Sequence, residues 1–174
     1  MKKPVIYAHR GASAYAPENT WAAFQKALEM EAGGIELDLH LSKDGHVVIC
    51  HDEQVDRVSN GSGLIRDKTL DELKNLDFGS WFGKAFEGEK ILTFDEFLKL
   101  IDGWDGILNV ELKSGIILYE GLEEKVVDIL RAYSRIDNTI ISSFNHYSLL
   151  TVKKLEPRLK TGVLYTAGLV DPWD

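Results

Sequence analysis

The chain has 174 residues, 44% of them hydrophobic, which is enough for one folded domain with its own core. Its formal net charge of -8 argues against a nucleic-acid partner, since no basic stripe offsets the acidic residues. The single cysteine, Cys50, excludes an intramolecular disulfide, and its apolar neighbours indicate a small core residue. Neither a signal peptide nor a run of ~20 apolar residues is evident, so we expect a cytoplasmic protein without a membrane span.

The first part of the chain reads as strand, helix and strand. Residues 5–8 form a short apolar strand, and Thr20 caps the helix that follows. Residues 35–41 alternate apolar and polar side chains, which in an open sheet indicates one face in water. In a closed α/β barrel both faces are covered. Glu36 and Asp38 would then face the mouth of the barrel.

The next apolar strand, residues 47–50, follows a link with the turn dipeptide Asp44-Gly45. The link is too short for the helical crossover that normally joins parallel strands. The chain therefore makes either an extended return across the barrel or a hairpin. We expect a hairpin to carry His51 to the end of the sheet away from Asp38, which would separate the two.

Residues 52 to about 92 lack a clean period and read as an excursion from the regular barrel. A capping box, Thr69 with Glu72, opens a short helix within it. The segment 78–86 is aromatic and rich in glycine. We interpret its aromatic side chains as a satellite core. The alternative is a lid over the mouth that touches the substrate through Trp81, Phe82 or Phe86.

Alternation of helix and strand resumes at Thr93. The expected elements are a helix from 93 to 101, a strand at 107–112, a helix at 122–133, a strand at 139–143, a helix ending before Pro157 and a strand at 161–165. This pattern predicts an α/β fold, a TIM-type (β/α) barrel with about six of its eight strands, in a single domain spanning residues 1–174. A complete barrel usually needs roughly 250 residues. We therefore expect a C-terminally truncated barrel, whose open sheet a missing segment or a homo-oligomer partner would close.

Polar side chains gather where the predicted strands end. All strands of an α/β barrel open at one mouth, so these residues should meet there: His9, Arg10, Glu36, Asp38, His51, Glu111 and Lys113. The three carboxylates among these residues, Glu36, Asp38 and Glu111, would repel one another without a cation. Their oxygen ligands suit a hard divalent ion, Mg²⁺ or Ca²⁺.

The remaining four residues are of the types that bind and cleave a phosphate ester. His9 and His51 are candidates for general acid and base, because an imidazole titrates near pH 6.5. Arg10 and Lys113 would contact a phosphate, although Lys113 has an ion pair with Glu111 as its alternative. The other three histidines have no such neighbours and are taken as structural: His40, His46 and His146.

Four segments together resemble the glycerophosphodiester phosphodiesterase family: HRG-x₅-PENT at residues 9–20, IELDLHLSKDGHVVICHDE at 35–53, NVELK at 109–113 and SSFN at 142–145. The resemblance implies a barrel of the phospholipase-C-like kind. It also implies metal-dependent hydrolysis of a small-molecule glycerophosphodiester to glycerol 3-phosphate and an alcohol.

The resemblance implies a role for each site residue. His9 and His51 match the acid–base pair, Arg10 and Lys113 match phosphate contacts, and the metal ligands are Glu36, Asp38 and Glu111. It also favours the extended return over the hairpin. Two other functions stay open: a lysophospholipase D acting on lipid headgroups, and an inactive fragment that only binds phosphate esters or a partner chain.

Overall fold

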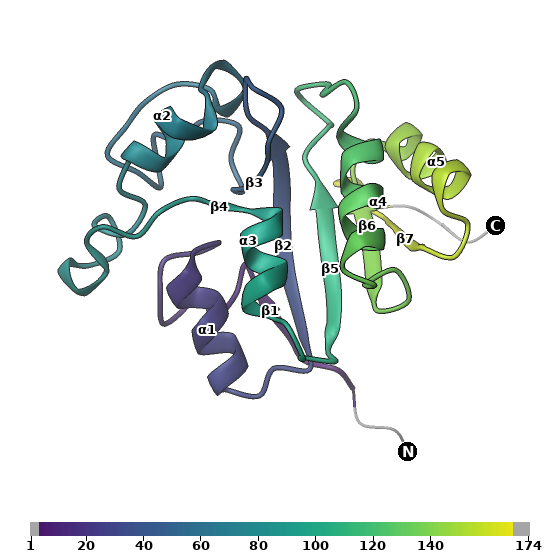
Figure 1. The fold of residues 1–174 in the computed structure, drawn as a ribbon, viewed down its shortest axis with the longest axis horizontal. Helices are drawn as coiled ribbons and strands as arrows, with labels where there is room; N and C mark the ends of the chain where they lie inside the picture. Colours follow the sequence, from purple (N-terminus) through teal and green to yellow (C-terminus); the bar gives the residue numbers. More distant parts are fainter. Residues whose placement is uncertain (1–3, 169–174) are drawn as a thin grey trace.

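A computed structural model describes residues 4–168, in which seven strands form one mixed sheet (Figure 1). The strands are β1 (Tyr7–His9), β2 (Gly34–Leu41), β3 (Val47–Ile49), β4 (Leu92–Thr93), β5 (Ile107–Leu112), β6 (Thr139–Ser143) and β7 (Lys160–Val163). The α-helices are α1 (Trp21–Glu29), α2 (Leu70–Asn75), α3 (Phe94–Leu100), α4 (Leu122–Ala132) and α5 (His146–Leu155), with 3-10 turns at Ile65–Asp67 and Lys84–Phe86. The order along the sheet is β4-β3-β2-β5-β6-β7, and β1 also pairs with β2.

Strand β2 lies at the centre of the sheet and is buried along its whole length. Its apolar side chains, from Ile35 to Leu41, share one core cluster with residues of α1, α3, α4 and α5. Its polar side chains alternate with these and are buried on the opposite face. Two covered faces are typical of a barrel strand, as the sequence predicted. The α/β fold is thereby confirmed.

Both edges of β2 are occupied. Strand β5 runs parallel along one edge, from Gly34 to Leu39. The other edge is shared: β1 is parallel to its first residues, and β3 is antiparallel to its last ones. The two short strands therefore approach each other along the same edge of β2 and stop with a gap between them.

The connection from β2 to β3 is a hairpin, so the expected extended return was wrong. The expected consequence of a hairpin was also wrong. Strand β2 continues past Asp38 to Leu41, and β3 returns along it with Leu39 opposite Ile49. The backbone N–H of Cys50 then donates to the carbonyl of Asp38 at 3.0 Å. The hairpin brings His51 back beside Asp38 because β2 extends beyond Asp38 before the chain turns.

The excursion after β3 has a core of its own. Phe78 and Cys50 belong to it, together with Val48, Val55, Val58, Ile65, Leu73 and Ile91. Burial raises the pKa of the Cys50 thiol to about 12, as befits a core residue. The satellite core is thus confirmed for Phe78. The other three aromatic side chains stack edge to face on one another instead: Trp81, Phe82 and Phe86.

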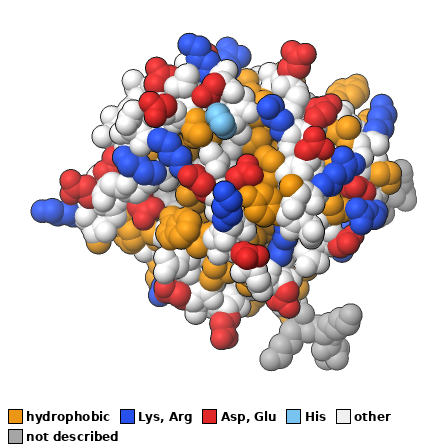
Figure 2. All heavy atoms as spheres, in the orientation of Figure 1, with side chains coloured by type: hydrophobic (Ala, Val, Ile, Leu, Met, Phe, Trp, Pro, Cys, Tyr) orange, Lys and Arg blue, Asp and Glu red, His pale blue; other side chains and the backbone are white. Residues whose placement is uncertain are grey.

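Two further features bear on partners. Figure 2 shows Lys and Arg side chains interspersed with Asp and Glu over one face of the described residues, rather than a continuous basic stripe. Within residues 4–168, every helix is too short or too polar to cross a membrane.

Strand β4 was not predicted from the sequence, because a two-residue strand directly before a helix is too short to show an alternation of apolar and polar residues.

Candidate active site

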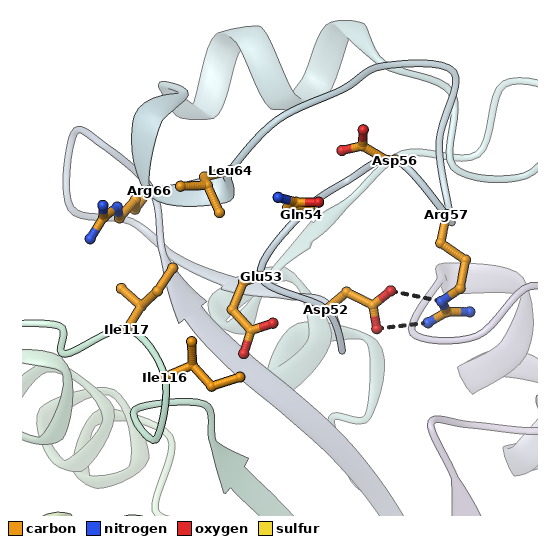
Figure 3. A pocket seen from close by; sticks show the side chains of 9 residues that line it. All are labelled: Asp52, Glu53, Gln54, Asp56, Arg57, Leu64, Arg66, Ile116 and Ile117. Carbon is orange, nitrogen blue, oxygen red and sulfur yellow. Dashed lines mark hydrogen bonds and ion pairs between the residues drawn. The ribbon is translucent and has the colours of Figure 1, made fainter.

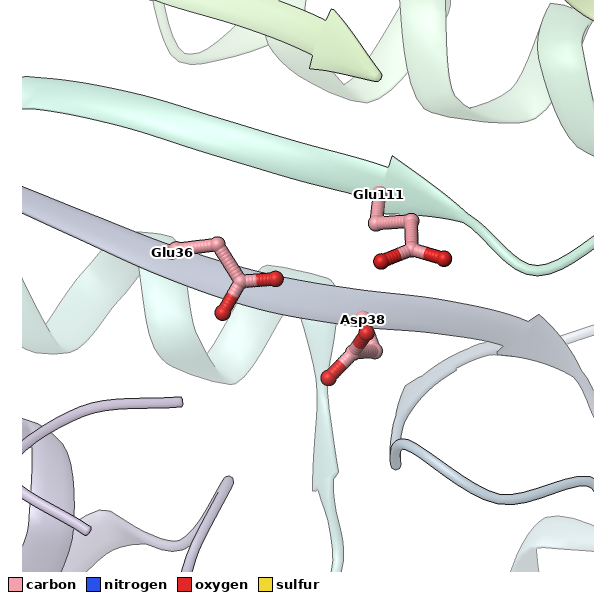
Figure 4. Close-up of side chains that lie close together, drawn as sticks. All are labelled: Glu36, Asp38 and Glu111. Atoms are coloured by element: carbon pink, nitrogen blue, oxygen red, sulfur yellow. The ribbon is translucent and has the colours of Figure 1, made fainter. Parts of the chain in front are cut away.

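The candidate site lies in the gap between the ends of β1 and β3. His9 ends β1 opposite Glu36, and His51 follows β3 beside Asp38. Across β2, Glu111 of β5 is in register with Asp38. Figure 4 shows the carboxylates of Glu36, Asp38 and Glu111 gathered between the two strands. One oxygen of each lies within 4.8 Å of the others.

The three carboxylates are buried close together, which is electrostatically unfavourable without a positive charge beside them. Burial and the charge of Asp38 raise the pKa of Glu36 to about 8. Burial also raises the pKa of Glu111. Among the described residues, Asp38 Oδ1 and Glu111 Oε1 accept no hydrogen bond of good geometry. Three close carboxylates with spare lone pairs fit a hard divalent cation.

Lys113 supplies one positive charge to the same group. Its Nζ lies 2.8 Å from Glu111 Oε1 and 3.1 Å from Asp38 Oδ1. These carboxylates raise the pKa of Lys113 against the opposing effect of burial. The ion pair with Glu111, the alternative to a phosphate contact, is therefore present. A phosphate contact by Lys113 stays a prediction.

Arg10 reaches the site from a tight turn after β1. Its backbone N–H donates to Glu36 Oε2 at 2.9 Å, and its Nε lies 3.6 Å from Asp38 Oδ2. Both Arg10 and Gly11 have positive φ, of 57° and 76°. The turn therefore places the backbone N–H and the guanidinium of one residue against two carboxylates.

Gly11→Ala is expected to destabilise the fold by about 2–4 kcal/mol and to weaken activity. A Cβ at this position would lie 2.8 Å from the backbone carbon of Ala23, and its φ disfavours any side chain. The measurement is the midpoint of urea unfolding. Gly103→Ala is the control, because its φ is the same 76° but its added Cβ meets nothing within 4 Å. Equal losses in the two variants would mean that the close approach to Ala23 is unimportant.

The two predicted catalytic histidines differ in their surroundings. The Nε2 of His9 lies 3.7 Å from Glu36 Oε2, and its side chain is 67% exposed. Partial burial and the Arg10 charge lower the pKa of His9. His51 is more enclosed, and its Nδ1 lies 2.6 Å from Asp52 Oδ1. Its ring also lines a cavity of about 470 Å³ with Glu111 and Lys113.

His40 is fully buried in β2 and has two ring contacts. Its Nδ1 lies 2.9 Å from the hydroxyl of Tyr119, and its Nε2 lies 3.3 Å from the carbonyl of His51. Burial lowers its pKa to about 4, so the ring is neutral at pH 7. These contacts fit the structural role that the sequence suggested. They also hold the backbone of His51.

Three polar residues around the site were not predicted from the sequence. Asn19 is buried at a positive φ of 58°, and its Nδ2 donates to Asp38 Oδ2 at 2.9 Å. Glu18 and Arg57 form ion pairs at the rim. Glu18 and Asn19 belong to the PENT segment, which was a signal without an assigned role. Arg57 lies in the excursion, where no sequence pattern marks it.

The sequence of the chain matches a known protein family. Residues 9–172 match the model of the glycerophosphoryl diester phosphodiesterase family. The chain belongs to this family. A glycerophosphodiester phosphodiesterase of Caldanaerobacter subterraneus subsp. tengcongensis is 54% identical over 98% of the chain and 70% of the relative. One from Bacillus subtilis is 40% identical over 92% of the chain and 59% of the relative.

Solved structures of the same family share the fold. An Oleispira antarctica phosphodiesterase in complex with the product sn-glycerol-3-phosphate is 38% identical, with a TM-score of 0.87 over 98% of this chain and 69% of that one. An Agrobacterium tumefaciens glycerophosphodiester phosphodiesterase is 33% identical, with a TM-score of 0.83 over 91% of this chain and 66% of that one. The chain thus forms a partial barrel of the family's TIM type, as the sequence predicted.

Proposed function

We propose that this chain hydrolyses glycerophosphodiesters to glycerol 3-phosphate and an alcohol, with a divalent cation held by Glu36, Asp38 and Glu111. The observation that carries the proposal is the buried cluster of three carboxylates, with His9 beside Glu36, His51 in a cavity lined also by Glu111, and the cationic side chains of Arg10 and Lys113 against Asp38. Family membership supports this reaction class. The sn-glycerol-3-phosphate bound to the Oleispira protein supports the product.

Each side chain has a role in this reaction. A bound cation would draw charge from the non-bridging phosphate oxygens as the transition state forms. Arg10 and Lys113 bind the same oxygens, Arg10 through its fork and Lys113 as a point charge. One of the two histidines, His9 or His51, takes the proton of the nucleophile, which is water or the glycerol 2-hydroxyl. The other gives a proton to the departing alcohol.

Stabilisation of the protein by Mg²⁺ or Ca²⁺ is expected to increase as pH rises from 5.5 to 8.5. The folded-state pKa of Glu36, about 8, exceeds its ordinary value of 4.5. Its stabilising contribution is therefore complete below pH 4.5 and is lost as pH rises through 8. A cation competes with this proton, so its binding improves over the same range. Thermal unfolding with EDTA or with either metal measures the effect.

The control for this prediction is Glu36→Gln, which removes the titrating group. In EDTA its unfolding temperature should depend less on pH between 5.5 and 8.5 than that of the wild type. An unchanged pH dependence in this variant would remove Glu36 as the cause.

The test of the proposed function is release of glycerol 3-phosphate from glycerophosphocholine, followed by enzymatic detection. We expect release that stops with EDTA and returns with Mg²⁺ or Ca²⁺. Faster turnover of lysophosphatidylcholine micelles would favour the lysophospholipase D alternative. Phosphodiester binding without release from either substrate would support the inactive fragment.

A further inference from the structure

A chain of ion pairs joins Arg10 to His51 along the rim of the site. The Nη1 of Arg10 donates to Glu18 Oε1 at 3.0 Å. The same carboxylate accepts from Arg57, through Nη2 at 2.7 Å and Nη1 at 3.1 Å. Arg57 also donates to Asp52, through Nε at 2.7 Å and Nη2 at 3.1 Å (Figure 3). Asp52 in turn contacts His51 Nδ1 at 2.6 Å.

The Arg57 guanidinium donates two hydrogen bonds to each of two carboxylates that come from different parts of the chain. An ordinary surface ion pair has only one such contact. Glu18 precedes α1, and Asp52 follows β3. Bidentate networks of this kind hold geometry better than single exposed pairs do. The guanidinium therefore limits the movement of Asp52 relative to the β1 side of the site.

The charge state of Asp52 decides which nitrogen of His51 carries the proton. Hydrogen bonds from Arg57 lower the pKa of Asp52 to about 2. An ionised carboxylate only accepts hydrogen bonds, so Nδ1 of His51 must be the donor. In the neutral ring, Nε2 is then unprotonated. Within residues 4–168, Nε2 has no hydrogen bond, so it is available to a substrate.

We propose that Arg57 and Glu18 are positioning residues, which hold Asp52 so that His51 keeps its proton on Nδ1 and offers Nε2 to the reacting group. Their role in catalysis rests on the proposed function. The chain of contacts also couples the phosphate ligand Arg10 to the proton-transfer residue His51. The start of the excursion, which includes Arg57, thereby helps to position the catalytic histidine.

The first test reads the tautomer of His51 directly, without any turnover. Long-range ¹H–¹⁵N correlation spectra at alkaline pH show which ring nitrogen bears the proton, and the spectrum of His51→Gln assigns the signal. We expect the Nδ1–H form in the wild type and a substantial Nε2–H fraction in Arg57→Gln. Asp52→Asn is the positive control for a changed tautomer.

The matched control is Arg66→Gln. Arg66 lines the same cavity as Arg57, of about 560 Å³ (Figure 3). Its ion pair with Asp67 is long, at 3.8 Å. Arg66→Gln should keep the wild-type His51 spectrum. Arg57→Lys retains the charge without the fork and should fall between the wild type and Arg57→Gln. Glu18→Gln removes one of the two carboxylates that hold Arg57, so it should also raise the Nε2–H fraction, by less than Arg57→Gln does, and it decides the test if Arg57→Gln fails to fold.

The second test is kinetic. In Arg57→Gln we expect kcat for glycerophosphocholine to fall about tenfold or more with KM within about threefold, as for other residues that orient a catalytic group. Glu18→Gln should show a smaller loss of the same kind. An unchanged His51 tautomer in both Arg57→Gln and Glu18→Gln would overturn the proposal. Absence of turnover in the wild type would instead refute the proposed function, and the tautomer result would still decide the positioning.

Discussion

Replacing His51 with Ala is expected to reduce turnover of glycerophosphocholine by about 10²–10⁴-fold while the protein stays folded. Proton transfer by a positioned side chain contributes about this much. The ring of His51 is partly exposed, and it lines a cavity instead of filling the core. Its removal therefore leaves the packing of the sheet intact. The measurement is kcat for release of glycerol 3-phosphate, with circular dichroism and the unfolding temperature to verify the fold.

The matched control is His46→Ala, because His46 lies at the β2–β3 turn, is 53% exposed and is also beside an aspartate. This variant should keep wild-type turnover. Comparable losses in both variants would indicate damage to the hairpin. Normal turnover in His51→Ala would remove His51 from the mechanism and, with it, the function of the ion-pair chain at the rim.

Asp38→Asn is expected to weaken divalent-cation binding by more than about 100-fold and to abolish turnover. A change beside a metal ligand typically weakens binding by 10–100-fold, and loss of a ligand charge should exceed that. Asp38 is fully buried. It contacts Lys113 through Oδ1 and both Asn19 and Arg10 through Oδ2. Asparagine keeps the size of the side chain but removes its charge and half of its acceptor capacity.

Isothermal titration with Mg²⁺ and Ca²⁺ measures the binding, and thermal unfolding in EDTA shows whether the metal-free variant is folded. The control is Asp137→Asn, on a side chain that is 77% exposed and precedes the start of β6, whereas Glu111 pairs with β6 near its end, at Ser142. It should bind and turn over as the wild type does. A folded Asp38→Asn protein with undiminished cation affinity would contradict the metal site that we propose.

The hydrophobic pattern of the sequence determined the fold class, because core burial imposes a period on each strand and helix. The alternating apolar residues of β2 are buried in the structure, as are Phe94, Phe97 and Leu98 of α3 and Leu122, Val126 and Leu130 of α4. The predicted capping box at Thr69 is formed, and a second capping box forms at Thr93, where the sequence predicted a helix start. Parallel strands of a barrel open at one mouth, so the strand-end rule also located Glu36, Asp38 and Glu111 near one another.

Only the tertiary structure decided how the second half of the site is assembled. The link at 42–46 was compatible with two connections, and only the register of β3 on β2 shows that a hairpin returns His51 to Asp38. Arg57 was invisible to sequence reasoning for a related reason. Periodicity reports which residues face the core of their own element, whereas Arg57 pairs with Glu18, which precedes it by 39 positions. A contact between residues so far apart in the sequence depends on where their two loops meet. The packing of the whole sheet determines where that is.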